Sequence, residues 1–320
     1  MQKLELKEGF KERMKAILGK DYEKFMDSLE GEPLRSLRVN ELKISPAELR
    51  KRLEGRGWKI SQPFPSHPEI MTVDSPLEPG EMGRTLEHLL GYYYVQEISS
   101  MLPVIALSPK PGEAVLDLCA SPGSKTTQIA AKMENSGTLA ANEVDLGRMK
   151  ILSSNLERCG VSNAIVTRKD GSAVCSAFRE RGILFDKILV DAPCSGEGTL
   201  RNNPKTARMW NLNGIKRMSS VQRRLLSSAI GALKPGGEIV YSTCTYAPEE
   251  DEEVVNFILE NFKGEIRAEK ISLPVKSRAG ISSWNGEDYS ENIKYSCRIY
   301  PMDNNTEGFF LAKFRKVKSG

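Results

Sequence analysis

Histidine is scarce in this sequence of 320 residues, where only His67 and His88 are present. No Cys-x-x-Cys pair occurs either. Because zinc sites are usually built from clustered cysteines and histidines, we expect no metal centre. Protease chemistry that depends on a cysteine beside a histidine is poorly supported for the same reason.

Long apolar runs are also missing. No stretch approaches the roughly 18 consecutive apolar residues of a membrane span. Residues 1–10 carry lysines and glutamates where a secretory signal would be apolar. We therefore expect a cytoplasmic protein with no membrane partner, whose six cysteines are free thiols in a reducing compartment.

The net charge of +4 is unevenly distributed along the chain. Residues 109–240 carry 19 basic and 12 acidic side chains, whereas residues 1–108 carry 16 and 17. A solvated helix face would explain a local basic run, but a run without any carboxylate favours contact with a polyanion. Between residues 201 and 224 there are seven basic residues and no acidic one: Arg201, Lys205, Arg208, Lys216, Arg217, Arg223 and Arg224.

The first hundred residues predict helices followed by a small α/β module. Apolar residues at helical spacing predict helix over most of residues 1–30. An extended run over residues 34–42 leads into Ser45-Pro46-Ala47-Glu48, a capping box that predicts a helix ending at Gly55 or Gly57. Five prolines between residues 63 and 79 predict a linker or loop.

From residue 109 onward, short apolar runs alternate with helical stretches. This alternation is typical of a parallel sheet covered on both faces, and ligands of such sheets lie beyond the carboxyl ends of the strands. We expect one domain in residues 1–108 and a second in residues 109–320. The predicted strands are residues 114–118, 138–141, 164–167, 187–190 and 238–241.

A turn follows the first of these strands, within residues 117–126. It lacks the glycine directly before Lys125 that a P-loop requires, and it lacks two of the three glycines of a dinucleotide fingerprint. A Pro-Gly turn that enters a helix still exposes backbone N–H groups, and Glu143 ends the next strand, where a carboxylate accepts hydrogen bonds from a ribose. This combination suggests S-adenosylmethionine, although Glu143 taken alone could equally be a surface acid.

Two cysteines follow two different predicted strands. Cys194 lies in Asp191-Ala192-Pro193-Cys194-Ser195-Gly196, and Cys244 lies in Tyr241-Ser242-Thr243-Cys244-Thr245-Tyr246. A single free cysteine is usually a core residue, but two at matching positions indicate a chemical role. We interpret the remaining four as structural: Cys119, Cys159, Cys175 and Cys297.

Together these motifs resemble the Nol/Nop/Sun family of RNA cytosine-5 methyltransferases. The resemblance covers about residues 90–316. It departs from the family pattern at Ser121 and Ser124, where alanine or glycine is commoner. The residues that carry it are Leu116–Thr126, Asp191–Gly198, Tyr241–Thr245, Tyr94–Glu97, Arg201–Pro204 and Gly308–Phe310, with Pro33–Asn40 similar to an amino-terminal element implicated in RNA binding.

The resemblance implies that Cys244 is the nucleophile and that Cys194 assists release. Carbon 5 of cytosine becomes nucleophilic once a thiolate has added to carbon 6, and the resulting adduct must later be eliminated. Spacing alone leaves the nucleophile open, because DNA cytosine-5 methyltransferases use a Pro-Cys cysteine. Asp191 is expected to hydrogen-bond the base, and Lys125 to contact it and favour the thiolate.

For the cofactor, S-adenosylmethionine, the resemblance implies residues at the ends of three strands. Glu143 is expected at the ribose and Asp170 on the adenine side, with Arg148 and Asp191 as further candidates. The methionine end is assigned to the turn of Cys119, Ala120, Ser121, Pro122, Gly123, Ser124 and Lys125.

We therefore expect an α/β protein with a Rossmann-like, seven-stranded methyltransferase sheet whose last strand is Phe309–Phe314, preceded by a small N-terminal α/β RNA-binding domain. The expected substrate is tRNA, with rRNA as the alternative, and the target cytosine must be single-stranded or flipped out. The basic stretch 201–224 would hold neighbouring phosphates, and the acidic run 249–253 would form a helix amino terminus. We expect a monomer. A catalytically silent RNA-binding assembly factor is the alternative from another class, and both cysteines with Asp191 argue against it.

Overall fold

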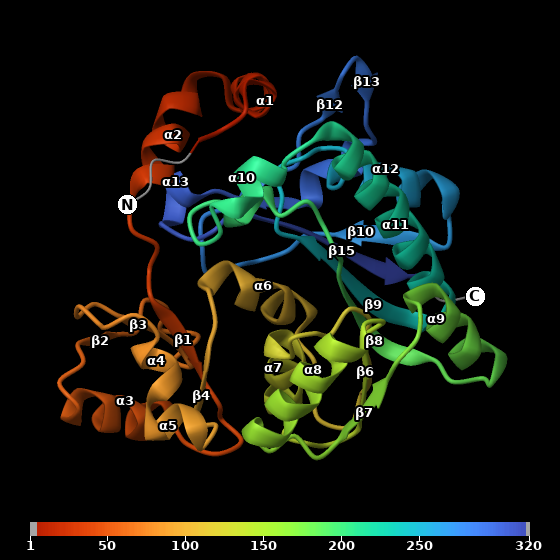
Figure 1. Ribbon diagram of the computed structural model, residues 1–320. Coiled ribbons are helices and arrows are strands. Elements are labelled where there is room, and N and C mark those ends of the chain that lie inside the picture. The colour runs from red at the N-terminus through yellow and green to blue at the C-terminus, as the bar shows by residue number, and fades with distance from the viewer. Residues whose placement is uncertain (1–4, 318–320) are drawn as a thin grey trace. The chain divides into compact units, whose positions relative to one another are not determined.

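The computed structural model of the chain describes residues 5–317 (Figure 1). The chain forms two compact units, which we call unit one (Met1–Pro33 and Val190–Gly320) and unit two (Leu34–Leu189). Residues 1–4 and 318–320, at the outer ends of the two predicted domains, lie outside the described residues. The division into domains 1–108 and 109–320 stays a prediction.

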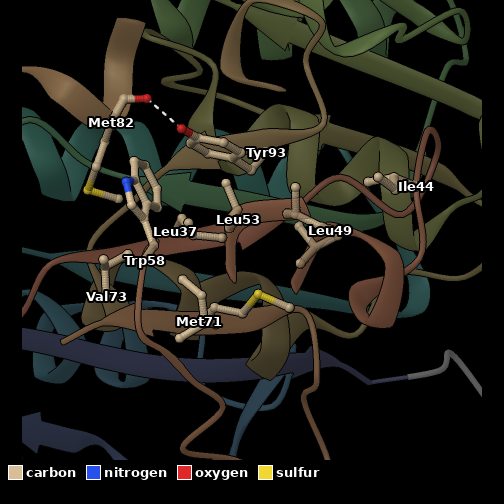
Figure 2. Close-up of a cluster of buried hydrophobic side chains, with 11 residues drawn as sticks. Leu37, Ile44, Leu49, Leu53, Trp58, Met71, Val73, Met82 and Tyr93 are labelled. Atoms are coloured by element: carbon tan, nitrogen blue, oxygen red, sulfur yellow. Dashed lines mark hydrogen bonds between the residues drawn. The ribbon is translucent and has the colours of Figure 1, made fainter. Parts of the chain in front are cut away.

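Unit two begins with a four-stranded antiparallel sheet in the order β2-β3-β1-β4. The predicted capping box is confirmed, because the Ser45 side chain accepts a hydrogen bond from the backbone N–H of Glu48. Figure 2 shows the apolar cluster of this module, in which the hydroxyl of Tyr93 donates to the carbonyl of Met82 at 2.6 Å. Its elements are β1 (Ser36–Val39), α3 (Pro46–Gly55), β2 (Ile60–Ser61), β3 (Ile70–Val73), α4 (Glu81–Arg84), α5 (Leu86–Leu89) and β4 (Tyr93–Val95).

The prediction of a loop throughout residues 63–79 was wrong, because β3 lies within it. All four residues of β3 are buried. The strand pairs with β1 on one side and with β2 on the other. The prolines at 68 and 76 flank the strand without interrupting its ladder, so they remove no hydrogen bond from it.

The rest of unit two is a parallel sheet in the order β8-β5-β6-β7 with helices between the strands. The predicted strands of this region are confirmed to within two residues. The last two residues of β8 belong to unit one. The elements are α6 (Ile98–Leu107), β5 (Ala114–Asp117), α7 (Ser124–Lys132), β6 (Thr138–Asn142), α8 (Leu146–Cys159), β7 (Ala164–Thr167), α9 (Gly171–Glu180) and β8 (Phe185–Asp191).

Unit one contains the antiparallel part of the sheet, in the order β11-β14-β15-β9 with β10 also on β15. Figure 1 shows β9 and β15 side by side, and they pair antiparallel over six residues. The predicted last strand is confirmed and runs two residues further, to Lys316. The strands are β9 (Leu233–Thr243), β10 (Ile266–Glu269), β11 (Arg278–Ala279), β14 (Cys297–Ile299) and β15 (Phe309–Lys316), and a separate hairpin is formed by β12 (Ser283–Trp284) and β13 (Glu287–Asp288).

Over the described residues the mixed sheet has nine strands. The short strands β10 and β11 therefore add to the seven that were expected. The helices of unit one that follow β8 are α10 (Lys205–Met209), α11 (Leu212–Gly231), α12 (Glu252–Asn261) and α13 (Pro301–Asn304). No helix within residues 5–317 is long and apolar enough to cross a membrane.

The amino-terminal helices α1 (Glu8–Leu18) and α2 (Tyr22–Glu30) belong to unit one. The ring of Phe25 packs edge-on against Tyr246, which stacks on Tyr300. Arg13 in α1 forms an ion pair with Glu249 at 2.5 Å. Both helices therefore pack on residues that come shortly after Cys244 in the chain.

Candidate active site

The structure brings Cys194 and Cys244 together in unit one. Cys244 directly follows β9, and Cys194 lies three residues after the end of β8. Their sulfur atoms are 3.1 Å apart, and the backbone N–H of Cys244 donates to the sulfur of Cys194 at 3.4 Å. Both are partly buried and neither is in a disulfide. Two thiols in contact can act on the same bound substrate.

Hydrogen bonding to Cys244, together with burial, raises the pKa of Cys194 well above its ordinary value. A thiol with a raised pKa keeps its proton at neutral pH. Because the two thiols are in contact, ionisation of one disfavours ionisation of the other, and the thiol that stays protonated can hold or donate a proton beside a thiolate nucleophile.

Asp191 is positioned by β9. Its carboxylate accepts a hydrogen bond of 2.7 Å from the Ser242 hydroxyl, two residues before Cys244. The backbone N–H of Ala192 donates to the carbonyl of Ser242 at 2.9 Å. Hydrogen bonds thus join the Asp-Ala-Pro-Cys and Ser-Thr-Cys motifs through residues that precede each cysteine in the chain.

The residues that follow the two cysteines also contact each other. The hydroxyl groups of Ser195 and Thr245 are 2.8 Å apart, and Thr245 donates to the carboxylate of Glu197 at 2.9 Å. Glu197 also accepts from the backbone N–H of Tyr246 and from the indole of Trp210. Burial raises the pKa of Glu197. This network fixes the backbone on the carboxyl side of Cys244.

Gly198 and Gly308 are linked to the main chain of Cys244 by successive backbone hydrogen bonds. The N–H of Gly198 donates to the carbonyl of Cys244 at 2.8 Å, and the N–H of Gly308 donates to the carbonyl of Gly198 at 2.9 Å. A Cβ on Gly198 would lie 2.2 Å from the carbonyl oxygen of Gly308. This close backbone approach explains glycine at position 198, whereas a Cβ on Gly308 would lie 2.1 Å from the hydroxyl of Tyr246.

Two further residues hold the Cys194 turn, and the sequence analysis missed both. The carboxylate of Glu250 accepts from the N–H of Ser195 at 2.9 Å and from the amide of Gln222 at 2.8 Å. The same amide nitrogen donates to the carbonyl of Pro193 at 2.9 Å. Burial raises the pKa of Glu250 to about 7. The only signal in the sequence was the acidic run that contains Glu250.

The interpretation of residues 249–253 as a helix amino terminus was incomplete. The run does lead into α12, which begins at Glu252. However, Glu250, Asp251 and Glu252 are fully buried. Glu252 forms a buried ion pair with Arg298. Glu250, Asp251 and Glu252 are therefore held by side chains of unit one in addition to any interaction with the dipole of α12.

The turn predicted to bind a cofactor lies in unit two, between β5 and α7. Asp117 accepts a hydrogen bond of 2.7 Å from Thr126, which fixes the start of α7 on the end of β5. Gly123 has φ of +106°, a conformation that favours glycine. Ala120 and Ser121 are buried, Cys119 and Ser124 are partly buried, and Pro122 is exposed.

Glu143 and Arg148 lie beside this turn. The carboxylate of Glu143 accepts from the N–H of Asp145 at 2.9 Å and lies 3.4 Å from the guanidinium of Arg148. Arg148 donates to the carbonyl of Ser121 at 3.0 Å, and the Ser121 hydroxyl donates to the carbonyl of Arg148 at 3.0 Å. The structure therefore brings Glu143, Arg148 and the turn together.

Asp170 caps α9, where its side chain accepts from the N–H groups of Ser172 and Ala173. Asn142, a residue missed by the sequence analysis, joins the loops at this edge. Its amide donates to the carbonyls of Leu118 and Lys169, at 3.3 and 3.0 Å. The ends of β5, β6 and β7 are thereby drawn together.

Lys125 is buried, and its ammonium donates to the Ser100 hydroxyl at 2.9 Å. Near it, the buried Arg38 donates to the carbonyl of Ser124 at 2.6 Å and to the Thr127 hydroxyl at 2.7 Å. Burial lowers the pKa of Arg38 to about 10, which leaves it charged at neutral pH. Within the element expected to bind RNA, Arg38 therefore supports α7, whereas Arg35 is exposed.

The basic stretch 201–224 has two kinds of members. Arg201 donates to the carbonyl of Glu32 at 2.8 Å and to the side chain of Asn305 at 2.6 Å, so it has a structural role. Arg223 pairs with Glu253 at 3.2 Å. The exposed members are Lys205, Arg208, Lys216, Arg217 and Arg224. No group of three or more metal-binding side chains occurs in the part of the chain that the structure describes.

The sequence is similar to two family models. The model described as 16S rRNA methyltransferase RsmB/F matches residues 104–315. The model described as the N-terminal domain of 16S rRNA methyltransferase RsmF matches residues 6–98.

Similar curated proteins include enzymes named for tRNA and for rRNA. The chain is 41% identical to the tRNA (cytosine(49)-C(5))-methyltransferase of Pyrococcus abyssi, over 98% of this chain and 100% of that protein. It is 38% identical to the ribosomal RNA small subunit methyltransferase F of Vibrio campbellii, over 97% of this chain. The chain spans only 63% of the length of that Vibrio relative.

Two solved structures are similar over nearly the whole chain. A methyltransferase homolog protein from Pyrococcus horikoshii has a TM-score of 0.85 and 36% identity, covering 98% of this chain and 96% of that one. NSun6 from Pyrococcus horikoshii with SFG has a TM-score of 0.81 and 25% identity, covering 98% and 99%.

Proposed function

Because the chain belongs to the 16S rRNA methyltransferase RsmB/F family, we propose that it transfers a methyl group from S-adenosylmethionine to carbon 5 of cytosine in RNA. The observation that carries this proposal is the contact of 3.1 Å between Cys194 and Cys244. One thiol is needed to activate the base, and a second group beside it promotes release of the adduct. The silent assembly factor would need neither.

In the proposed reaction Cys244 is the nucleophile. Its thiolate forms a bond to carbon 6 of the cytosine, and the electron pair moves to carbon 5, which takes the methyl group. The proton on carbon 5 then leaves to a base, the bond between carbon 6 and sulfur breaks, and the thiolate is regenerated. We assign this role to Cys244 because it lies in the Ser-Thr-Cys segment, which points to the RNA enzymes, whereas a Pro-Cys cysteine such as Cys194 is also found in the DNA enzymes.

Cys194 is assigned to release, with Asp191 and Lys125 as the other residues that contact the base. The carboxyl of Asp191, oriented by Ser242, would hydrogen-bond the nitrogen 3 side of the ring and stabilise charge as the thiolate adds. Lys125 would contact the base and favour the thiolate form of the nucleophilic cysteine through its positive charge.

The residues of unit two fit S-adenosylmethionine. Gly123 lets the backbone turn tightly in front of α7, and the buried Glu143 has lone pairs left for ribose hydroxyls, since a carboxylate accepts about four hydrogen bonds. Residues 119–125 would hold the methionine end, Glu143 with Arg148 the ribose side, and Asp170 the adenine side. Asp191 is a further candidate for the cofactor. When bound, the cofactor supplies an electrophilic methyl group.

We propose tRNA as the substrate and rRNA as the alternative. The relative named for tRNA matches this chain over its full length, whereas the relative named for rRNA is matched over 63% of its length. Exposed cations of α10 and α11 belong to the same unit as the cysteines and would hold phosphates beside the target base. The protein would act in the cytoplasm as a monomer.

The experiment is methylation of bulk tRNA, isolated from cells that lack this protein, with labelled S-adenosylmethionine. The wild-type protein is expected to form 5-methylcytidine, and Cys244→Ala is expected to form none while still binding the cofactor. Cys194→Ala is expected to accumulate a covalent protein–RNA adduct on a denaturing gel. Bisulfite sequencing locates the modified base, and a parallel reaction with ribosomal RNA tests the alternative. Cofactor binding without transfer to either RNA would support the assembly factor.

A further inference from the structure

The turn that carries Cys194 is held from both sides by two buried side chains with no role in the reaction described above. Gln222, on α11, donates to the carbonyl of Pro193, which precedes Cys194. Glu250, just before α12, accepts from the N–H of Ser195, which follows Cys194. Gln222 and Glu250 are also hydrogen-bonded to each other at 2.8 Å. Both are completely buried.

These contacts fix the backbone on both sides of Cys194. Proline has no N–H, so the carbonyl of Pro193 is the one polar backbone group through which that residue can be held. The N–H of Ser195 has its partner in Glu250. With both neighbours held, the main chain of Cys194 has little freedom to move away from Cys244.

Cys244 is held by other groups. Its carbonyl accepts from the N–H of Gly198, and the next residue, Thr245, donates to Glu197. Loss of Glu250 removes none of these bonds. Apart from the Ser195–Thr245 contact and the bond from the Cys244 N–H to the Cys194 sulfur, the hydrogen bonds that hold the two cysteines therefore come from different residues.

We propose that Glu250 is a positioning residue for the release step: together with Gln222 it holds the turn of Cys194 so that the thiol stays against the sulfur of Cys244. This inference rests on the proposed function. Without Glu250, the N–H of Ser195 and the amide of Gln222 are left buried and short of a partner, so the turn relaxes to find others. Addition of Cys244 to the base continues, and elimination slows.

The test compares Glu250→Ala, Glu250→Gln and the control Glu260→Gln, which lies on the exposed face of α12. Each is mixed with the same bulk tRNA and labelled S-adenosylmethionine. The readout is the ratio of covalent adduct to released methylated RNA. This ratio does not change when only part of a preparation is folded, so a purely structural defect leaves it unaltered.

Glu250→Ala is expected to raise the adduct-to-product ratio about tenfold. This is the effect expected when the loss of about one buried hydrogen bond raises the free-energy barrier to release. Glu250→Gln keeps an acceptor oxygen and is expected to restore the wild-type ratio, which the Glu260→Gln control also shows. If Glu250→Ala does not fold, Gln222→Met removes the same clamp from its other end and is expected to raise the ratio as well.

The outcomes separate the inference from the function on which it rests. A wild-type protein that methylates tRNA, with an unchanged ratio in folded Glu250→Ala and Gln222→Met, would overturn the positioning role alone. Failure of the wild-type protein to methylate, with no adduct in Cys194→Ala, would overturn the proposed function and this inference with it.

Discussion

Glu250 is expected to make the stability of the protein fall as the pH rises. Its pKa is raised by burial from 4.5 to about 7. Below the pKa of the unfolded chain the carboxyl is protonated in both states, and its full contribution to stability is present. Between about pH 4.5 and 7, Glu250 is ionised in the unfolded chain but is still mostly protonated in the folded protein. The contribution is therefore lost between about pH 4.5 and 7.

The magnitude follows from the difference in pKa. One pKa unit corresponds to about 1.4 kcal/mol, so a rise from 4.5 to about 7 corresponds to about 3 kcal/mol of unfolding free energy. Glu250→Gln removes the titration and keeps an acceptor oxygen for Ser195 and Gln222. The variant is expected to gain about 3 kcal/mol relative to the wild-type protein between about pH 4 and pH 8.

The assay is urea unfolding of both proteins over this pH range, plotted as the difference between their free energies of unfolding. Other shifted groups, such as Glu197 and Glu249, are present in both proteins and largely cancel in the difference. Glu260→Gln, at an exposed position, is the matched control and is expected to show a flat difference. A flat or falling difference for Glu250→Gln would show that the folded protein holds Glu250 ionised, and would refute the reasoning.

Three further predictions concern other parts of the site. Replacing Lys205, Lys216 and Arg217 together by glutamine is expected to lower the slope of log Kd against log salt for tRNA by about 2 to 3, measured by filter binding, and an unchanged slope would exclude this phosphate contact. Gly198→Ala forces its Cβ to within 2.2 Å of a main-chain oxygen, so the melting temperature should fall and methyl transfer should be lost; a variant with wild-type melting contradicts the packing argument. Arg38→Met removes the buried guanidinium that donates to the first carbonyl of α7 and to the Thr127 hydroxyl, which should lower the free energy of unfolding by about 3 kcal/mol. It should also weaken S-adenosylmethionine binding in calorimetry, and unchanged binding would separate Arg38 from the proposed cofactor turn.

Local pattern was sufficient for most elements of the fold. The capping box at Ser45 and the continuous apolar strands such as β5 are encoded within a few residues of sequence, because each depends on spacing and on nearby hydrogen bonds. The loop predicted for residues 63–79 failed where pairing was long-range. β3 is a strand because β1 and β2 supply its partners.

For the candidate site, the sequence by itself was enough to predict the two cysteines at strand ends. Cys194 and Cys244 each follow the end of a strand, and the motifs around them are local. Which charged side chains serve the site was decided only by the tertiary structure. Arg201, interpreted as a phosphate contact, is bound to the carbonyl of Glu32, 169 positions away in the chain. Glu250 holds a turn 55 positions away. From sequence alone, a charged side chain is interpreted as a solvated or ligand-binding group. Its burial and its partners depend on residues that are distant in sequence, so only the tertiary structure reveals a structural role.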